Sequence, residues 1–134
     1  MENVVKVLEK NNFVFKEEIS RTNDMSCELV FEYKGTGHLL TVLNYLNIPT
    51  TFVDVEKKII MIKEYRILAW FMKYSGSADV DYVATEIYDL EEAKQLFNDK
   101  VKEFKEKYKY SSYESITLKL VNGRNIIEKE YVLC

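Results

Sequence analysis

The chain has 134 residues, with 19 Lys and Arg against 22 Asp and Glu, a net charge of −3 and 47% hydrophobic residues. This length and composition predict a single globular domain over residues 1–134, because the chain can bury a sizeable core and has only 4 Gly and 1 Pro to build linkers. No apolar run approaches the roughly 18 residues of a membrane span and the start lacks a secretion signal, so we expect a cytoplasmic protein with no membrane partner.

Residues that carry chemistry are few. The chain has one histidine, His38, and two cysteines, Cys27 and Cys134, that lie far apart in the sequence. A structural zinc site needs four ligands at short spacings, so we expect no metal and no cofactor. We assign no catalytic residue, although histidine is the side-chain type best suited to acid–base work near neutral pH. The acidic balance and the small number of arginines argue against nucleic acid as the partner.

Short helices and strands are predicted for the first half of the chain. Apolar spacing and turn residues indicate, in order, a helix near 4–11, strands at 13–15 and 28–34 around a polar turn at 21–24, a helix at 38–46, and a hairpin of 51–55 with 59–62. Pro49 is expected to stop the second helix. In an antiparallel hairpin, Val53 and Val55 share a face with Ile60 and Ile62.

Residues 65–74 are apolar on both of their possible strand faces. They form either a buried central strand or a short buried helix, and periodicity does not decide between the two. The strand interpretation divides the chain into an N-terminal helix and two ββαββ-like halves, 13–63 and 65–133. These halves share an order of elements but no pattern of residues.

The second half contains the clearest pattern, an amphipathic helix at 90–108. Its apolar residues recur at steps of three and four, and Asp89 with Glu92 forms a variant of the capping box. A strand at 82–88 precedes the helix. A hairpin follows, with strands near 115–121 and 126–133, an Asn122-Gly123 turn and Leu118 opposite Ile127. Tyr131 is expected on its apolar face.

Together these elements predict an α+β fold, in which a mostly antiparallel sheet carries one long amphipathic helix and shorter helices. The strongest candidate for a ligand site is the loop between a predicted strand and a predicted helix: Lys34, Gly35, Thr36, Gly37 and His38. Backbone N–H groups at a helix start can hold a phosphate or carboxylate, and Lys34, Thr36 and His38 offer further donors. The other interpretation is a tight turn that needs glycine for its backbone geometry.

Tyrosine is abundant, with 10 in the chain. Tyr108, Tyr110 and Tyr113 cluster with lysines after the long helix, and tyrosine is enriched in protein interfaces. The cluster therefore indicates either an interface or side chains half-buried at the rim of a sheet. Weak RNA binding over this segment is a third interpretation.

The lack of a catalytic motif favours a non-catalytic binding protein whose partner is another protein. The abundance of Lys, Asn, Ile and Tyr is typical of an AT-rich genome, so an inhibitor or accessory protein from a bacterial phage or mobile element is one concrete form. Such an acidic inhibitor would occupy a basic target surface. The alternative is a small-ligand protein that binds or sequesters a phosphate or nucleotide, or a small hydrolase, at Lys34–His38. A homodimer is compatible with the apolar content.

Overall fold

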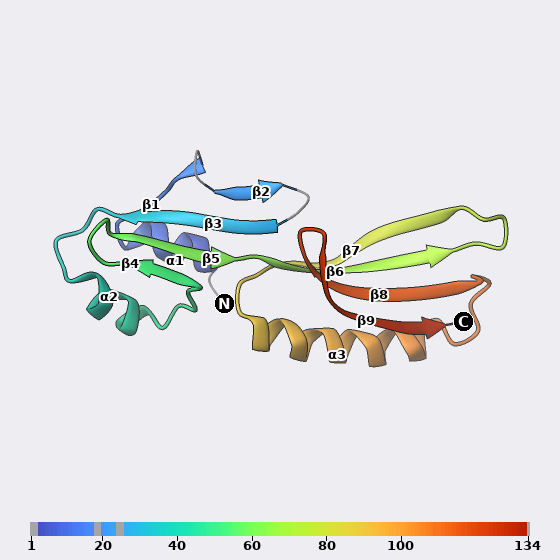
Figure 1. The fold of residues 1–134 in the computed structure, drawn as a ribbon. Coiled ribbons are helices and arrows are strands. Elements are labelled where there is room, and N and C mark those ends of the chain that lie inside the picture. Colours follow the sequence, from blue (N-terminus) through green and yellow to red (C-terminus); the bar gives the residue numbers. More distant parts are fainter. Residues whose placement is uncertain (1–2, 18–19, 24–25, 134) are drawn as a thin grey trace.

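The structure is a computed structural model, and it describes residues 3–17, 20–23 and 26–133. In chain order the elements are α1 (Val4–Lys10), β1 (Phe13–Phe15), β2 (Arg21–Asn23), β3 (Ser26–Tyr33), α2 (Leu39–Leu46), β4 (Phe52–Asp54), β5 (Ile59–Lys63), β6 (Tyr65–Met72), β7 (Ala78–Ile87), α3 (Leu90–Lys107), β8 (Ser115–Asn122) and β9 (Asn125–Leu133). The fold is α+β, as the sequence predicts, and the predicted mostly antiparallel pairing is antiparallel throughout the strands that the structure describes. The strands form two separate sheets, which lie end to end in an elongated molecule (Figure 1).

The first sheet has the order β1-β3-β5-β4, and β2 shares the outer edge of β3 with β1. α1 and α2 pack on one face of this sheet. Leu8 of α1 and Leu39 and Leu43 of α2 join Phe31 and Ile60 in a core that excludes water. α2 ends because Asn47 adopts a left-handed backbone, which asparagine tolerates better than most residues.

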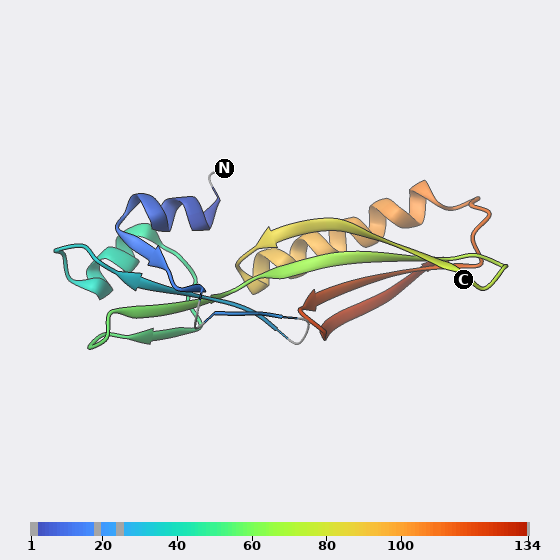
Figure 2. The same cartoon turned by 90° about the horizontal axis from the view of Figure 1, so that it is seen from above.

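The second sheet has the order β7-β6-β8-β9, and α3 packs across one of its faces. α3 begins at Leu90 because the carboxylate of Asp89 accepts the backbone N–H of Glu92. Its apolar stripe, which includes Ala93 and Phe97, covers alternate residues of β6 and β8. In Figure 2 the three helices lie on the same side of the strands, so each sheet has one covered face and one face without a helix.

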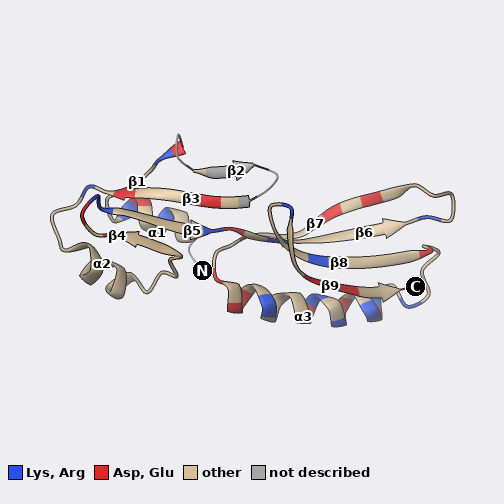
Figure 3. Cartoon of the chain, viewed as in Figure 1, with Lys and Arg blue, Asp and Glu red and all other residues tan. Residues whose placement is uncertain are grey.

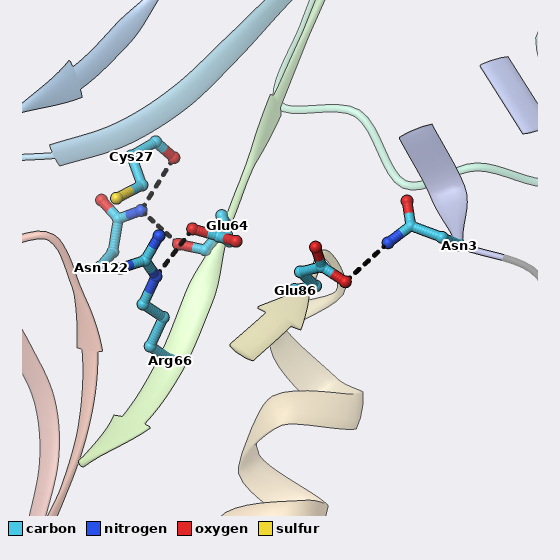
Figure 4. Close-up of polar contacts among 6 residues, drawn as sticks. All are labelled: Asn3, Cys27, Glu64, Arg66, Glu86 and Asn122. Carbon is cyan, nitrogen blue, oxygen red and sulfur yellow. Dashed lines mark hydrogen bonds and ion pairs between the residues drawn. The ribbon is translucent and has the colours of Figure 1, made fainter. Parts of the chain in front are cut away.

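The two sheets are joined through Glu64, the single residue between β5 and β6. The buried amide of Asn122 donates to the backbone carbonyls of Cys27, at 3.1 Å, and of Glu64, at 2.8 Å (Figure 4). The Arg66 guanidinium pairs with the Glu64 carboxylate at 2.9 Å. Tyr88, which follows β7, packs into the core of the first sheet. The joint is therefore held by polar contacts and by a shared core.

Several predicted elements agree with the structure and three details differ. Residues 65–72 are a central strand, which decides between the two interpretations of that segment. Arg21, Thr22 and Asn23 pair with β3 as a strand rather than forming the predicted turn, and Asp24 lies outside the described residues. Val53 pairs with Ile60 as expected, but Val55 lies beyond the end of β4.

The register of the C-terminal hairpin also differs from the prediction. Asn122 pairs with Asn125, so the loop residues are Gly123 and Arg124, and Leu118 lies opposite Glu130 instead of Ile127. Tyr131 is consequently 55% exposed, on the face away from the core. The two halves of the chain have different strand orders, so the internal duplication remains a prediction without support from topology.

Candidate functional site

The loop of Lys34, Gly35, Thr36, Gly37 and His38 connects β3 to α2, as predicted. It wraps closely around the side chain of Tyr33. The Gly37 N–H donates to the Tyr33 hydroxyl at 3.0 Å, and a Cβ on Gly35 would lie 2.6 Å from Cε1 of the Tyr33 ring. Glycine is needed at position 35 because the backbone approaches an aromatic ring.

The charged residues of this loop are engaged within the chain. The Lys34 ammonium pairs with the Glu32 carboxylate at 3.0 Å, and hydrogen bonding to Lys34 lowers the pKa of Glu32. His38 is the N-cap residue of α2, and its side chain makes no capping hydrogen bond. Two of the expected anion donors, the Gly37 N–H and the Lys34 ammonium, are thus already paired. Anion binding at this loop remains a prediction.

Of Tyr108, Tyr110 and Tyr113, only Tyr110 projects into solvent, and it is 91% exposed. Tyr108 and Tyr113 are half-buried and pack against Phe71, with ring centroids 5.4 and 5.1 Å away. These two rings cover the end of the core beneath α3. The arrangement corresponds to tyrosines at the rim of a sheet, and it leaves Tyr110 as the one ring of the three that is free to contact a partner.

A cleft of about 780 Å³ lies where the two halves meet. Its lining includes the carboxylates of Glu86, Asp89 and Glu92 and the amide of Asn3. Asn3 donates to Glu86 at 3.0 Å (Figure 4), and Asp89 caps α3, so both carboxylates have roles in the fold. Burial raises the pKa of Tyr88, in the same wall, to about 12.

A surface that sequence reasoning missed is the face of the second sheet opposite α3, which we call the open face. Side chains alternate between the two faces of a strand, and α3 packs on Tyr65, Ile67, Ala69 and Phe71 of β6. The open face therefore comprises Arg66, Leu68, Trp70 and Met72 of β6, Ala78, Val80 and Tyr82 of β7, Thr117, Lys119 and Val121 of β8, and Ile126, Lys129 and Tyr131 of β9.

Strand register places these residues in rows across the open face. One row runs Val80, Trp70, Thr117 and Tyr131, and the next runs Tyr82, Leu68, Lys119 and Lys129. Tyr82 and Tyr131 are 65% and 55% exposed at the two sides, and Val80 and Ile126 are also exposed. Apolar and aromatic side chains grouped in this way on a surface mark interaction sites.

The three cations of the open face lie over aromatic rings. The Lys119 ammonium is 4.4 Å from the ring centroid of Trp70, the Lys129 ammonium is 5.2 Å from that of Tyr131, and the Arg66 guanidinium is 5.6 Å from that of Tyr82. Attraction to the rings holds each cation against the sheet.

No protein-family model, curated protein sequence or solved structure matches this chain. No helix in the described parts of the chain is both long and apolar enough to cross a membrane. Among residues 3–17, 20–23 and 26–133, no group of three His, Cys, Asp or Glu side chains is placed to hold a metal ion.

Proposed function

We propose that the chain is a non-catalytic binding protein of the cytoplasm, that its partner is another protein, and that it binds this partner through the open face. The observation that supports the proposal most is the exposure of Tyr82, Tyr131, Val80 and Ile126 around Trp70 on a sheet face that no described helix covers. Tyr and Trp supply large, stiff contact area and dominate the binding energy of protein interfaces.

The layout of the open face resembles that of an interface core. Trp70 and Leu68 lie on the central strand β6, and the more exposed rings lie on the two outer strands. Residues that exclude water usually surround the strongest anchors of an interface. Trp70 is thus the expected anchor, with Tyr82 and Tyr131 beside it. An inhibitor or accessory protein of a phage or mobile element would act in this manner.

Site-specific photo-crosslinking tests the proposal. A benzoylphenylalanine residue replaces Tyr82 in one variant and Tyr131 in a second, and the matched controls carry it at Tyr45 and Tyr110, which are 87% and 91% exposed on other surfaces. We expect the variants at Tyr82 and Tyr131 to capture the same protein in expressing cells, and the controls not to capture it. Equal capture from all four positions, or no protein captured from Tyr82 and Tyr131, would overturn the proposal.

A further inference from the structure

The two faces of the second sheet differ in the sign of their charged side chains. Asp79 and Asp81 of β7 lie opposite Phe71 and Ala69, so their side chains point to the α3 side. Glu130 of β9 pairs with Lys105 of α3. At the positions that make up the open face, all charged side chains are cations, namely Arg66, Lys119 and Lys129. The acidic segments of β7 and the basic position in β8 are visible in Figure 3.

Two of these cations lie side by side in a way that does not stabilise the folded sheet. Lys119 and Lys129 are direct partners on neighbouring strands, where like charges destabilise a sheet. Arg66 differs, because its guanidinium already pairs with Glu64. Within the described chain, Lys119 and Lys129 have aromatic rings as neighbours rather than carboxylates. A sheet that keeps two adjacent ammonium groups beside exposed rings is suited to a partner that supplies the negative charge.

We infer that the partner of the open face is an acidic protein segment, whose carboxylates meet Lys119 and Lys129 while its apolar side chains pack on Trp70 and Leu68. This inference rests on the proposed function. A second copy of the chain is a poor occupant, because the charged side chains of its own open face are all cations, so two open faces in contact would supply no carboxylate to either lysine pair. Nucleic acid is disfavoured as well, because its binding rests on many cations that contact successive phosphates, and the open face offers only Lys119 and Lys129 besides Arg66, whose guanidinium pairs with Glu64.

The fluorescence of the single tryptophan of the chain can be used to measure binding at the open face. Trp70 lies in the centre of the open face beneath Lys119, so its emission reports contact there. The probe is a short peptide that alternates glutamate with leucine, and its comparison is the same peptide with glutamine in place of glutamate. A thymidine oligonucleotide tests the nucleic-acid alternative. The protein variant is Lys119→Gln/Lys129→Gln, and the control is Lys94→Gln/Lys102→Gln on α3, which changes net charge equally.

We expect the glutamate peptide to change Trp70 emission in a saturable way and to bind about tenfold more weakly to the Lys119→Gln/Lys129→Gln variant, as two exposed ion pairs are lost. The control variant should bind like the original protein. Any of four results would overturn the inference. The protein could bind both peptides equally well, or the glutamate peptide could cause no saturable change in Trp70 emission. The Lys119→Gln/Lys129→Gln variant could bind the glutamate peptide as tightly as the control variant does, or the oligonucleotide could bind more tightly than the peptide. Crosslinking from Tyr82 and Tyr131 distinguishes the two proposals. If a protein is captured at these positions and binds the Lys119→Gln/Lys129→Gln variant as tightly as the original protein, the inference fails and the proposed function is retained.

Discussion

Replacing Asn122 by alanine tests the joint between the two sheets. The Asn122 amide is buried and donates to the carbonyls of Cys27 and Glu64. Cys27 belongs to β3 of the first sheet, and Glu64 is the residue that joins β5 to β6. The Cys27 carbonyl also accepts the Glu64 N–H at 2.9 Å, so it keeps one partner in the variant. The Glu64 carbonyl loses the Asn122 donor.

The expected loss in the free energy of unfolding is about 2–3 kcal/mol. A net contribution of about 1 kcal/mol for each hydrogen bond accounts for most of it, and the cost of a buried carbonyl without a donor adds the rest. The free energy of unfolding of a small domain is about 5–15 kcal/mol, so the variant should still fold. Asn122→Asp should lose at least as much, because a carboxylate cannot donate to either carbonyl.

Urea denaturation followed by Trp70 fluorescence and by far-UV circular dichroism measures this change. Asn98→Ala, on the exposed side of α3, is the matched control and should stay within about 0.5 kcal/mol of the original protein. If Asn122→Ala unfolded at the same urea concentration as Asn98→Ala, the role given to the amide would be refuted.

Three other predictions concern packing and pH. Phe97→Ala leaves a cavity in the core beneath α3 and should lower the free energy of unfolding, measured by urea denaturation, by about 3–5 kcal/mol. A loss below about 1 kcal/mol would contradict the packing described. Gly35→Ala should cost about 1–3 kcal/mol, because the new methyl group meets Tyr33, and unchanged stability would show that the loop approaches the ring less closely. Burial raises the pKa of Tyr88 from 10.0 to about 12, so the native state keeps a proton that the unfolded chain releases. Stability should fall as the pH rises through this interval and fall less in Tyr88→Phe; an equally steep fall in that variant would contradict the assignment.

The sequence allowed the elements with strong local signals to be predicted. The period of the apolar residues and the Asp89 cap located α3, whose end differs by one residue from the prediction. The hairpin register was wrong for two reasons. The two loop residues are Gly123 and Arg124 instead of Asn122 and Gly123, so Asn122 belongs to β8 and its side chain contacts Cys27, far away in the sequence. An irregularity in the pairing between Leu120 and Val121 shifts β9 by one further residue, which moves Tyr131 to the other face of the sheet.

The open face was missed for a related physical reason. Leu68, Trp70 and Met72 make β6 apolar on its solvent-facing side as well as on its core side, so the segment shows no polar face to mark it as half-exposed. The lysine pair becomes visible only when Lys119 and Lys129 are placed on neighbouring strands. The net charge of −3 suggested a basic target, but the charge of the open face itself favours an acidic one.

Fluorine NMR of the protein labelled with fluorotryptophan shows whether the open face contacts the partner protein. The chain has one tryptophan, Trp70, so a single resonance reports on the open face even in an unpurified extract. When the protein captured by crosslinking is added, we expect this resonance to shift or broaden and Lys119→Gln/Lys129→Gln to weaken the effect. An unchanged resonance in a sample where the complex has formed would contradict the claim that this face is the binding surface.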